Sequence, residues 1–217
     1  YAEKNGIMCI ERSTLLGEIE TLYNCPIDVS GTHGKTSTTG MLAHIYMASE
    51  ANPTVLIGGD LDILEGNMHI GGNDFFISEA CEYHRSFLEF FPKIGIILNI
   101  EADHLDYFKD LDEIVDTFCD FAKILPDDGT LIIANDNPNT IKTAKCAKCK
   151  VITCGLNDAD FVAKNIEFDQ NGCASFDVYH NGENLTRVAL NVNGKHNIYN
   201  ALCAFACGYD LGFNIEL

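Results

Sequence analysis

The stretch PIDVSGTHGKTSTTGML, residues 26–42, places a short apolar run before a glycine-containing loop and a helix-forming segment after it. Glycines let the backbone approach a ligand closely, and the free N–H groups at a helix N-terminus attract anions. Lys35 would neutralise the β- and γ-phosphates of a nucleotide, and Thr36 would offer its hydroxyl to Mg²⁺. The stretch therefore predicts a phosphate-binding loop between a strand and a helix, as found in α/β folds.

The general phosphate-loop pattern, G-x-x-x-x-G-K-[ST], is matched incompletely in this stretch. Val29 stands at the position of the first glycine, and Gly31 comes two residues later. The alternative is an ordinary glycine-rich turn, but a turn would leave Lys35 without an explanation. The strand before the loop and the helix after it favour phosphate binding.

Apolar runs alternate with helix-period segments along the rest of the chain. The predicted strands cover residues 27–29, 54–58, 74–78, 94–100, 130–134 and 151–154, and the predicted helices cover 35–49, 85–90, 111–125 and 137–145. Such alternation is typical of a mostly parallel sheet flanked by helices. From residue 161, alternating apolar and polar residues around Asn-Gly pairs predict a small antiparallel β meander of about three strands. A largely buried helix is expected after Gly194.

The composition restricts the classes of partner. The 217 residues carry 14 Lys and Arg against 32 Asp and Glu, a formal net charge of −18, with 47% hydrophobic residues. This charge argues against nucleic acid and membrane surfaces, which are bound through clustered basic side chains. Without a membrane-length apolar run or a signal peptide, the sequence predicts a soluble cytoplasmic protein. The ten cysteines are expected to be reduced thiols, because a chain of this size can build a core without disulfides.

Acidic and polar side chains follow two of the predicted strands, where an α/β sheet binds its ligands. Glu79 and Glu82 follow the run 74–78, and a second group follows the run 94–100. Helix caps and solvated loops are the common alternatives for such residues, but Glu79 comes directly after a buried run and is expected to bind a metal. The pair Cys146 and Cys149 is weak support for a zinc module, because no second pair stands at finger spacing.

Four motifs, in order, resemble the Mur ligase family of peptidoglycan synthesis. They are GTHGKTSTT at 31–39, EACEYHRSFL at 79–88, NIEADHLDYF at 99–108 and GKHNIYNALCA at 194–204. The resemblance covers nearly the whole chain and is to the central ATP-binding domain, whose loop form GT-x-GKT explains the displaced first glycine. One departure is Cys81, which stands where the family usually has a carboxylate.

The resemblance implies roles for individual residues. ATP would bind on the loop residues Gly31, Thr32, His33, Gly34, Lys35, Thr36 and Ser37, with the adenine against His196 and Asn200. One Mg²⁺ would be held by Thr36 and Glu79, and His104 would hold a second; Mn²⁺ could substitute. Lys35, Glu79 and His104 would be the catalytic residues. His33, Ser86 and Asn99 would face the muramyl substrate.

Within the family, His33 and the EA-x-E-x-x-x-SFL stretch are similar to the branch that joins L-alanine to UDP-N-acetylmuramate. The resemblance then implies an ATP-dependent ligase that works through an acyl phosphate. The alternatives are a recycling ligase that attaches a tripeptide to the same nucleotide sugar, and a non-catalytic nucleotide-binding module.

The family also implies a domain organisation. Residues 1–24 are expected to be the end of an N-terminal UDP-binding domain, and residues 25–217 the central domain, with the C-terminal ligase domain absent. Such a chain is expected to be inactive by itself. The sequence leaves the oligomeric state open.

Overall fold

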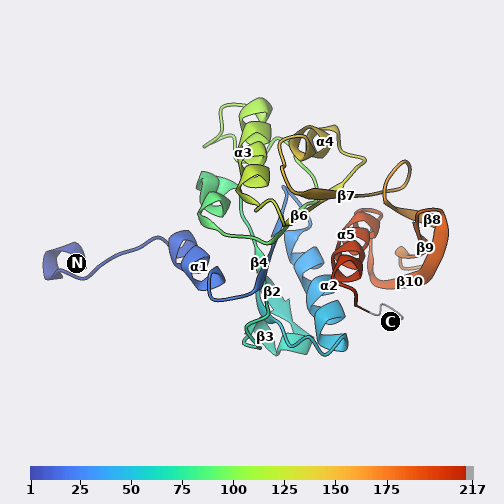
Figure 1. Cartoon of the computed structure of the whole chain (residues 1–217), viewed down its shortest axis with the longest axis horizontal. Helices are drawn as coiled ribbons and strands as arrows, with labels where there is room; N and C mark the ends of the chain where they lie inside the picture. Colours follow the sequence, from blue (N-terminus) through green and yellow to red (C-terminus); the bar gives the residue numbers. More distant parts are fainter. Residues whose placement is uncertain (214–217) are drawn as a thin grey trace.

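The computed structural model describes residues 1–213 as a mixed β-sheet with helices on both faces (Figure 1). Within these residues ten strands join in the order β10-β9-β8-β7-β6-β5-β1-β4-β2-β3. Their bounds are β1 Cys25–Ser30, β2 Thr54–Leu61, β3 Gly66–His69, β4 Phe75–Glu79, β5 Ile94–Ile97, β6 Thr130–Ala134, β7 Lys150–Gly155, β8 Phe161–Phe168, β9 Cys173–His180 and β10 Glu183–Asn193. Parallel pairing runs from β2 through β4, β1, β5, β6 and β7 to β8, which confirms the mostly parallel sheet.

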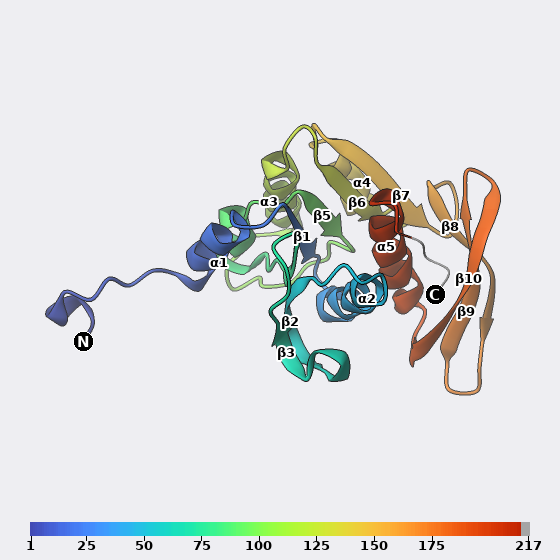
Figure 2. The same cartoon turned by 60° about the horizontal axis from the view of Figure 1, so that its bottom comes forward.

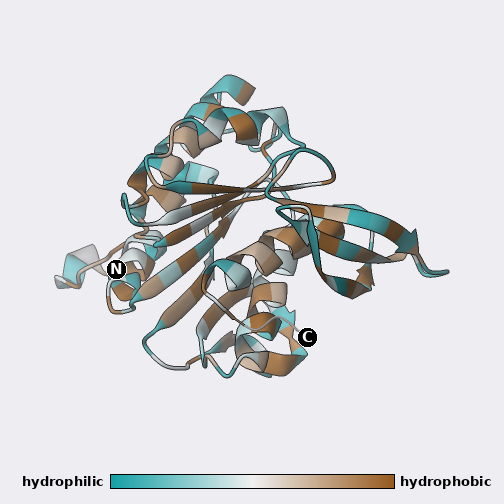
Figure 3. Ribbon diagram, turned by 45° about the vertical axis from the view of Figure 1, so that its right-hand side comes forward, coloured by the Kyte–Doolittle hydropathy of each residue, from teal (hydrophilic) through white to brown (hydrophobic). Residues whose placement is uncertain are grey.

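Both faces of this sheet are apolar, because successive side chains of a strand point to opposite sides. On β6, Ile132 belongs to one hydrophobic cluster, whereas Leu131 and Ile133 belong to the other. The hydrophobic colouring of the central strands in Figure 3 reflects this burial. A strand that is buried on both faces needs a near-continuous apolar run, and these runs made the central strands predictable from the sequence.

Five α-helices accompany the sheet within residues 1–213: α1 Arg12–Glu20, α2 Lys35–Ala48, α3 Leu111–Ile124, α4 Pro138–Ala144 and α5 His196–Asp210. Helices α2 and α5 pack against each other in the first cluster, and α3 and α4 pack in the second (Figures 1 and 2). The helices expected at 35–49, 111–125 and 137–145, and the buried helix after Gly194, are confirmed. None of the helices in this part of the chain has the length and hydropathy to cross a membrane.

The predicted meander is formed by β8, β9 and β10, which pair in antiparallel fashion. Its second turn uses Asn181 and Gly182, with φ values of 52° and 84°. These left-handed conformations are what an Asn-Gly hairpin turn supplies. Because β8 also pairs with β7 in parallel, the meander extends the main sheet (Figure 2).

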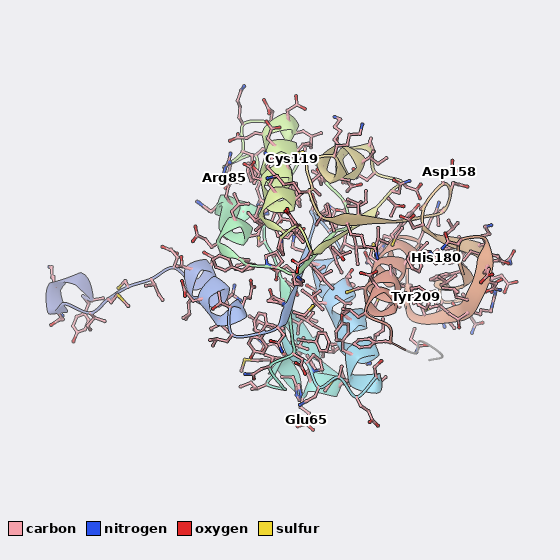
Figure 4. The ribbon with its side chains drawn as sticks, in the orientation of Figure 1. Glu65, Arg85, Cys119, Asp158, His180 and Tyr209 are labelled. Atoms are coloured by element: carbon pink, nitrogen blue, oxygen red, sulfur yellow. A yellow bond between two sulfur atoms is a disulfide. The ribbon has the colours of Figure 1, made fainter. Side chains whose placement is uncertain are left out.

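Two local predictions differ from the structure, and one strand was not predicted. The helix expected at 85–90 is instead the 3₁₀ segment η3, Tyr83–Glu89, because His84 and Arg85 have left-handed φ values of 52° and 57°. Arg85 reaches α3, where its guanidinium donates to Glu113 at 3.1 Å (Arg85 is labelled in Figure 4). The strand expected at 94–100 ends at Ile97, and the edge strand β3 has too short an apolar pattern to be predicted.

The expectation that all cysteines are free thiols is wrong for one pair. Cys119 of α3 forms a disulfide with Cys146, just after α4, with their Cα atoms 5.5 Å apart (Cys119 is labelled in Figure 4). The pair was not predictable because the two residues are 27 positions apart and meet only when α3 and α4 pack. It also removes Cys146 from the C-x-x-C pair that suggested zinc, and residues 1–213 hold no cluster of three metal-binding side chains.

Two carboxyl groups, one on helix α1 and one on strand β1, are buried next to each other. Glu20 of α1 and Asp28 of β1 are both fully buried, and among residues 1–213 nothing donates to Glu20 Oε1 or Asp28 Oδ2. Burial raises the pKa of both carboxyls, and the neighbouring charge raises that of Glu20 further. A proton held by one carboxyl can donate to the other, so the pair retains a proton at neutral pH.

Replacing Glu20 by glutamine is expected to flatten the pH dependence of stability. In the unfolded chain Glu20 ionises near pH 4.3, while its raised pKa keeps it protonated in the folded chain. The free energy of unfolding therefore falls as pH rises above that value, by up to ~1.4 kcal/mol per pH unit. Urea unfolding between about pH 5 and pH 8 measures the slope. An unchanged slope in Glu20→Gln would contradict the shared proton.

Candidate functional site

The loop between β1 and α2 lies at the centre of the sheet, where β1 is flanked by β4 and β5. Gly31 and Gly34 have φ values of 135° and 93°, which side-chain-bearing residues rarely adopt. A Cβ on Gly34 would lie 2.7 Å from Asn200 Oδ1, and one on Gly31 would lie 3.1 Å from the Asn99 carbonyl oxygen. Both glycines are therefore required, and Gly31 serves this loop although it is displaced from the general pattern.

Lys35 begins α2 and points back over the loop. Its ammonium donates to the carbonyl oxygens of Gly31 at 2.5 Å and Thr32 at 3.4 Å. It also pairs with Glu82 Oε2 at 3.2 Å. Glu82 is only 2% exposed, so the loop lysine has a buried carboxylate beside it.

Thr36 and Glu79 meet as the sequence predicts. The Thr36 hydroxyl donates to Glu79 Oε2 at 3.0 Å, and the Gly58 amide donates to Glu79 Oε1 at 2.5 Å. Glu79 ends β4, which pairs directly with β1, so the strand register brings the carboxylate to the loop. Two oxygen ligands placed side by side could hold Mg²⁺, which usually takes one or two protein carboxylates and completes its shell with substrate phosphates and water.

His104 lies in the loop after β5 with a left-handed φ of 51°. Its ring lies 4.5 Å, centroid to centroid, from the ring of Tyr83, whose hydroxyl donates to Asp106 at 2.9 Å. That hydrogen bond raises the pKa of Tyr83. Among residues 1–213, His104 makes no hydrogen bond to Thr36 or Glu79, the two residues expected to hold the other ion.

The three residues expected to face the substrate have different surroundings. Asn99 clamps the main chain of His33, accepting from its amide and donating to its carbonyl oxygen, both at 2.8 Å. The exposed imidazole of His33 lies 4.0 Å from Glu101. Ser86 donates to the Tyr83 carbonyl oxygen within η3, at 2.8 Å. Asn99 thus connects the loop to the segment that follows β5, whereas the hydrogen bond of Ser86 stays within η3.

A cavity of about 780 Å³ opens beside the loop. It is lined by six of the predicted residues, namely His33, Gly34, Ser37, Asn99, His196 and Asn200. His196 and Asn200 lie one turn apart on α5, so the helix brings them to the same wall. Asn200 is 3% exposed and lies against Gly34, which joins this wall to the loop.

Several lining residues escaped prediction. Asp136 and Asn137 follow β6, Lys195 precedes α5, and Tyr199 lies on its first turn. Burial and a hydrogen bond to Asp136 raise the pKa of Tyr199 to about 12. Asp136 and Asn137 could have been found by the rule that identified Glu79, because they also follow the carboxyl end of a buried strand. Glu82 was visible beside Glu79, but its pairing with Lys35 depends on the turn of η3.

Comparison with known proteins places this arrangement in a family. Residues 29–208 match the family model described as the Mur ligase middle domain. The chain belongs to the Mur ligase family. This Mur ligase domain is 47% identical over 215 residues to UDP-N-acetylmuramate–L-alanine ligase of Clostridium perfringens (strain 13 / Type A), covering 99% of this chain and 47% of that relative. The corresponding ligase of Clostridium acetobutylicum is 48% identical over 211 residues, covering 97% of this chain and 46% of the relative.

Solved structures of other family members have the same fold. The UDP-N-acetylmuramate-alanine ligase of Thermotoga maritima matches with a TM-score of 0.85 and 26% identity, covering 99% of this chain and 48% of that one. The UDP-N-acetylmuramate:L-alanyl-gamma-D-glutamyl-meso-diaminopimelate ligase of Neisseria meningitides matches with a TM-score of 0.83 and 25% identity, covering 97% and 69%. The Mur ligase domain described here spans about half the length of the curated relatives it matches.

Proposed function

We propose that this Mur ligase domain binds ATP and activates a carboxylate in the synthesis of a peptidoglycan precursor. The reaction is the joining of L-alanine to UDP-N-acetylmuramate, and the domain is the middle part of the ligase that performs it. The observation that carries the proposal is the loop of Gly31 and Gly34 with Lys35 above it and the Thr36–Glu79 pair beside it. Relatives of 47–48% identity that are named for this reaction support the choice of substrates.

ATP is expected to lie across the loop. The adenosine would occupy the cavity between the loop and α5, against His196 and Asn200. The phosphates would extend over Gly34 toward the N-terminus of α2, where free backbone N–H groups and the helix dipole favour negative charge. Lys35 would then donate to the β- and γ-phosphates.

Mg²⁺ would be held by Thr36 and Glu79, whose oxygens are already together. The ion would neutralise charge that develops on the phosphates during transfer. His104 is proposed as a ligand of a second ion, reached when substrate and nucleotide are both bound. Mn²⁺ could replace either ion, because it accepts the same oxygen and imidazole ligands.

The chemistry proceeds in two displacements. A carboxylate oxygen of UDP-N-acetylmuramate attacks the γ-phosphorus, the bond to the β-γ bridging oxygen breaks, and ADP leaves. The amine of L-alanine then attacks the acyl carbon, inorganic phosphate leaves with the bonding electrons, and the amine loses a proton to solvent. Positioning and charge neutralisation are what such transfers need most; Lys35 and the metal ions would contribute both, and Glu79 would act by holding Mg²⁺.

The choice of amino acid is tested by phosphate release from ATP with the full-length ligase that contains this domain. With UDP-N-acetylmuramate present, L-alanine is expected to stimulate release at least about tenfold more than the tripeptide L-alanyl-D-glutamyl-diaminopimelate, because the proposed reaction takes the free amino acid as its acceptor. Stimulation by the tripeptide alone would identify the recycling ligase instead. Nucleotide binding without stimulation by either compound would favour a non-catalytic module.

A further inference from the structure

Glu82 is the most buried charged group beside the loop, and the ligand-binding scheme above gives it no task. Its side chain is 3% exposed, and Lys35, its partner at 3.2 Å, is 17% exposed. Within residues 1–213 neither side chain has another ion-pair partner; the nearby Arg85 is engaged with Glu113 and Asp120 of α3. We propose that Glu82 is the positioning residue for Lys35, holding the ammonium over the loop so that it meets the phosphates of a bound nucleotide.

The donors of Lys35 can be counted. An ammonium has three N–H groups, and in the structure they donate to the carbonyl oxygens of Gly31 and Thr32 and to Glu82. Phosphate oxygens can replace the two carbonyl oxygens, which remain able to bind water. Glu82 has no such alternative, because a buried carboxylate that loses its counter-charge is strongly destabilised.

Lys35 therefore keeps Glu82 as its partner when the nucleotide is bound, and two of its N–H groups turn toward the phosphates. The negative charge of Glu82 weakens the attraction of the site for an anion. The same carboxylate, however, holds the flexible side chain of Lys35 where the phosphates bind. This inference rests on the proposed function for the identity of the ligand. The ion pair itself does not depend on it.

The anion affinity of a Glu82 variant distinguishes a positioning role of Glu82 from an effect of its charge alone. Removing a carboxylate near an anion site should tighten anion binding if only net charge matters. If Glu82 aims Lys35, Glu82→Gln should instead weaken binding, by about tenfold, because the neutral amide holds the ammonium less firmly. Glu101→Gln is the matched control, since Glu101 lines the cavity but its side chain is 61% exposed and does not contact Lys35.

The experiment compares the wild-type chain with Glu82→Gln, Lys35→Met, the double variant and Glu101→Gln. Calorimetry with a non-hydrolysable ATP analogue and Mg²⁺ measures affinity, and thermal unfolding measures stability. Glu82→Gln is expected to bind about tenfold more weakly, whereas Glu101→Gln should bind slightly more tightly. Lys35→Met should lower the melting temperature by roughly 5–15 °C, and Glu82→Gln in the same chain should restore most of that loss.

The binding measurement tests the positioning role of Glu82, and the stability measurement tests its ion pair with Lys35. Equal or tighter binding by a folded Glu82→Gln chain would overturn the positioning role. Additive effects on stability in the double variant would overturn the ion pair, since coupled residues give non-additive effects. If the wild-type chain binds no nucleotide, the proposed function fails, and the stability comparison alone decides whether Glu82 and Lys35 act as a unit.

Discussion

Lys35→Ala is expected to abolish phosphate release by the full-length ligase, lowering kcat/KM by at least about 10³-fold. The lysine places a positive charge over the loop of Gly31 and Gly34, and within residues 1–213 no other basic side chain donates to that loop. Steady-state assays at saturating UDP-N-acetylmuramate and L-alanine, over a range of ATP concentrations, provide the measurement. Turnover near the wild-type rate at saturating ATP would refute the assignment of this loop.

A matched control shows whether replacing any lysine by alanine lowers turnover. Lys109→Ala removes an exposed lysine whose ion pair is with its sequence neighbour Asp110, and it should leave turnover unchanged. Because Lys35 also neutralises the buried Glu82, thermal unfolding of Lys35→Ala must accompany the assay. The double variant Lys35→Met with Glu82→Gln is expected to recover most of the stability and still to be inactive, which separates lost catalysis from lost folding.

Glu79→Gln is expected to lower kcat by about 10²-fold or more and to raise the Mg²⁺ concentration needed for half-maximal activity. The amide keeps the size of the side chain and can still accept from Gly58, but it lacks the charge that a divalent cation requires. The measurement is a Mg²⁺ titration of activity in the two proteins.

Glu65→Gln is a suitable control for this titration, because Glu65 is an exposed carboxylate at the turn between β2 and β3 (labelled in Figure 4). It should leave the Mg²⁺ dependence unchanged. A wild-type Mg²⁺ profile for Glu79→Gln would mean that the Thr36–Glu79 pair is a structural hydrogen bond and holds no metal.

Much of the fold could be predicted because its central strands are buried on both faces. Runs such as TLIIA at 130–134 have no polar face, and the Asn-Gly turn at 181–182 specifies its hairpin locally. The segment around His84 and Arg85 was harder to predict. Its left-handed residues are stabilised by distant contacts, among them the pairing of Arg85 with Glu113, so local propensity gave a helix instead.

In the candidate site, too, what local sequence and strand pairing specify could be predicted, and what distant packing decides could not. Lys35, Thr36 and Glu79 were predictable because the loop is local and parallel pairing of β4 with β1 places Glu79 beside it. The surroundings of His104, which is expected to hold a second ion, depend on a loop conformation that no sequence pattern specifies, and the structure places its ring against that of Tyr83. The Cys119–Cys146 disulfide likewise depends on how two helices pack.

The central claim is that the loop from Gly31 to Thr36 binds the phosphates of ATP. Calorimetric titration of the 217-residue chain with a non-hydrolysable ATP analogue and Mg²⁺ tests it most directly, with Lys35→Ala as the comparison. Saturable 1:1 binding by the wild-type chain, weakened at least about tenfold in Lys35→Ala, is the predicted result. Equal binding by both chains would contradict the claim.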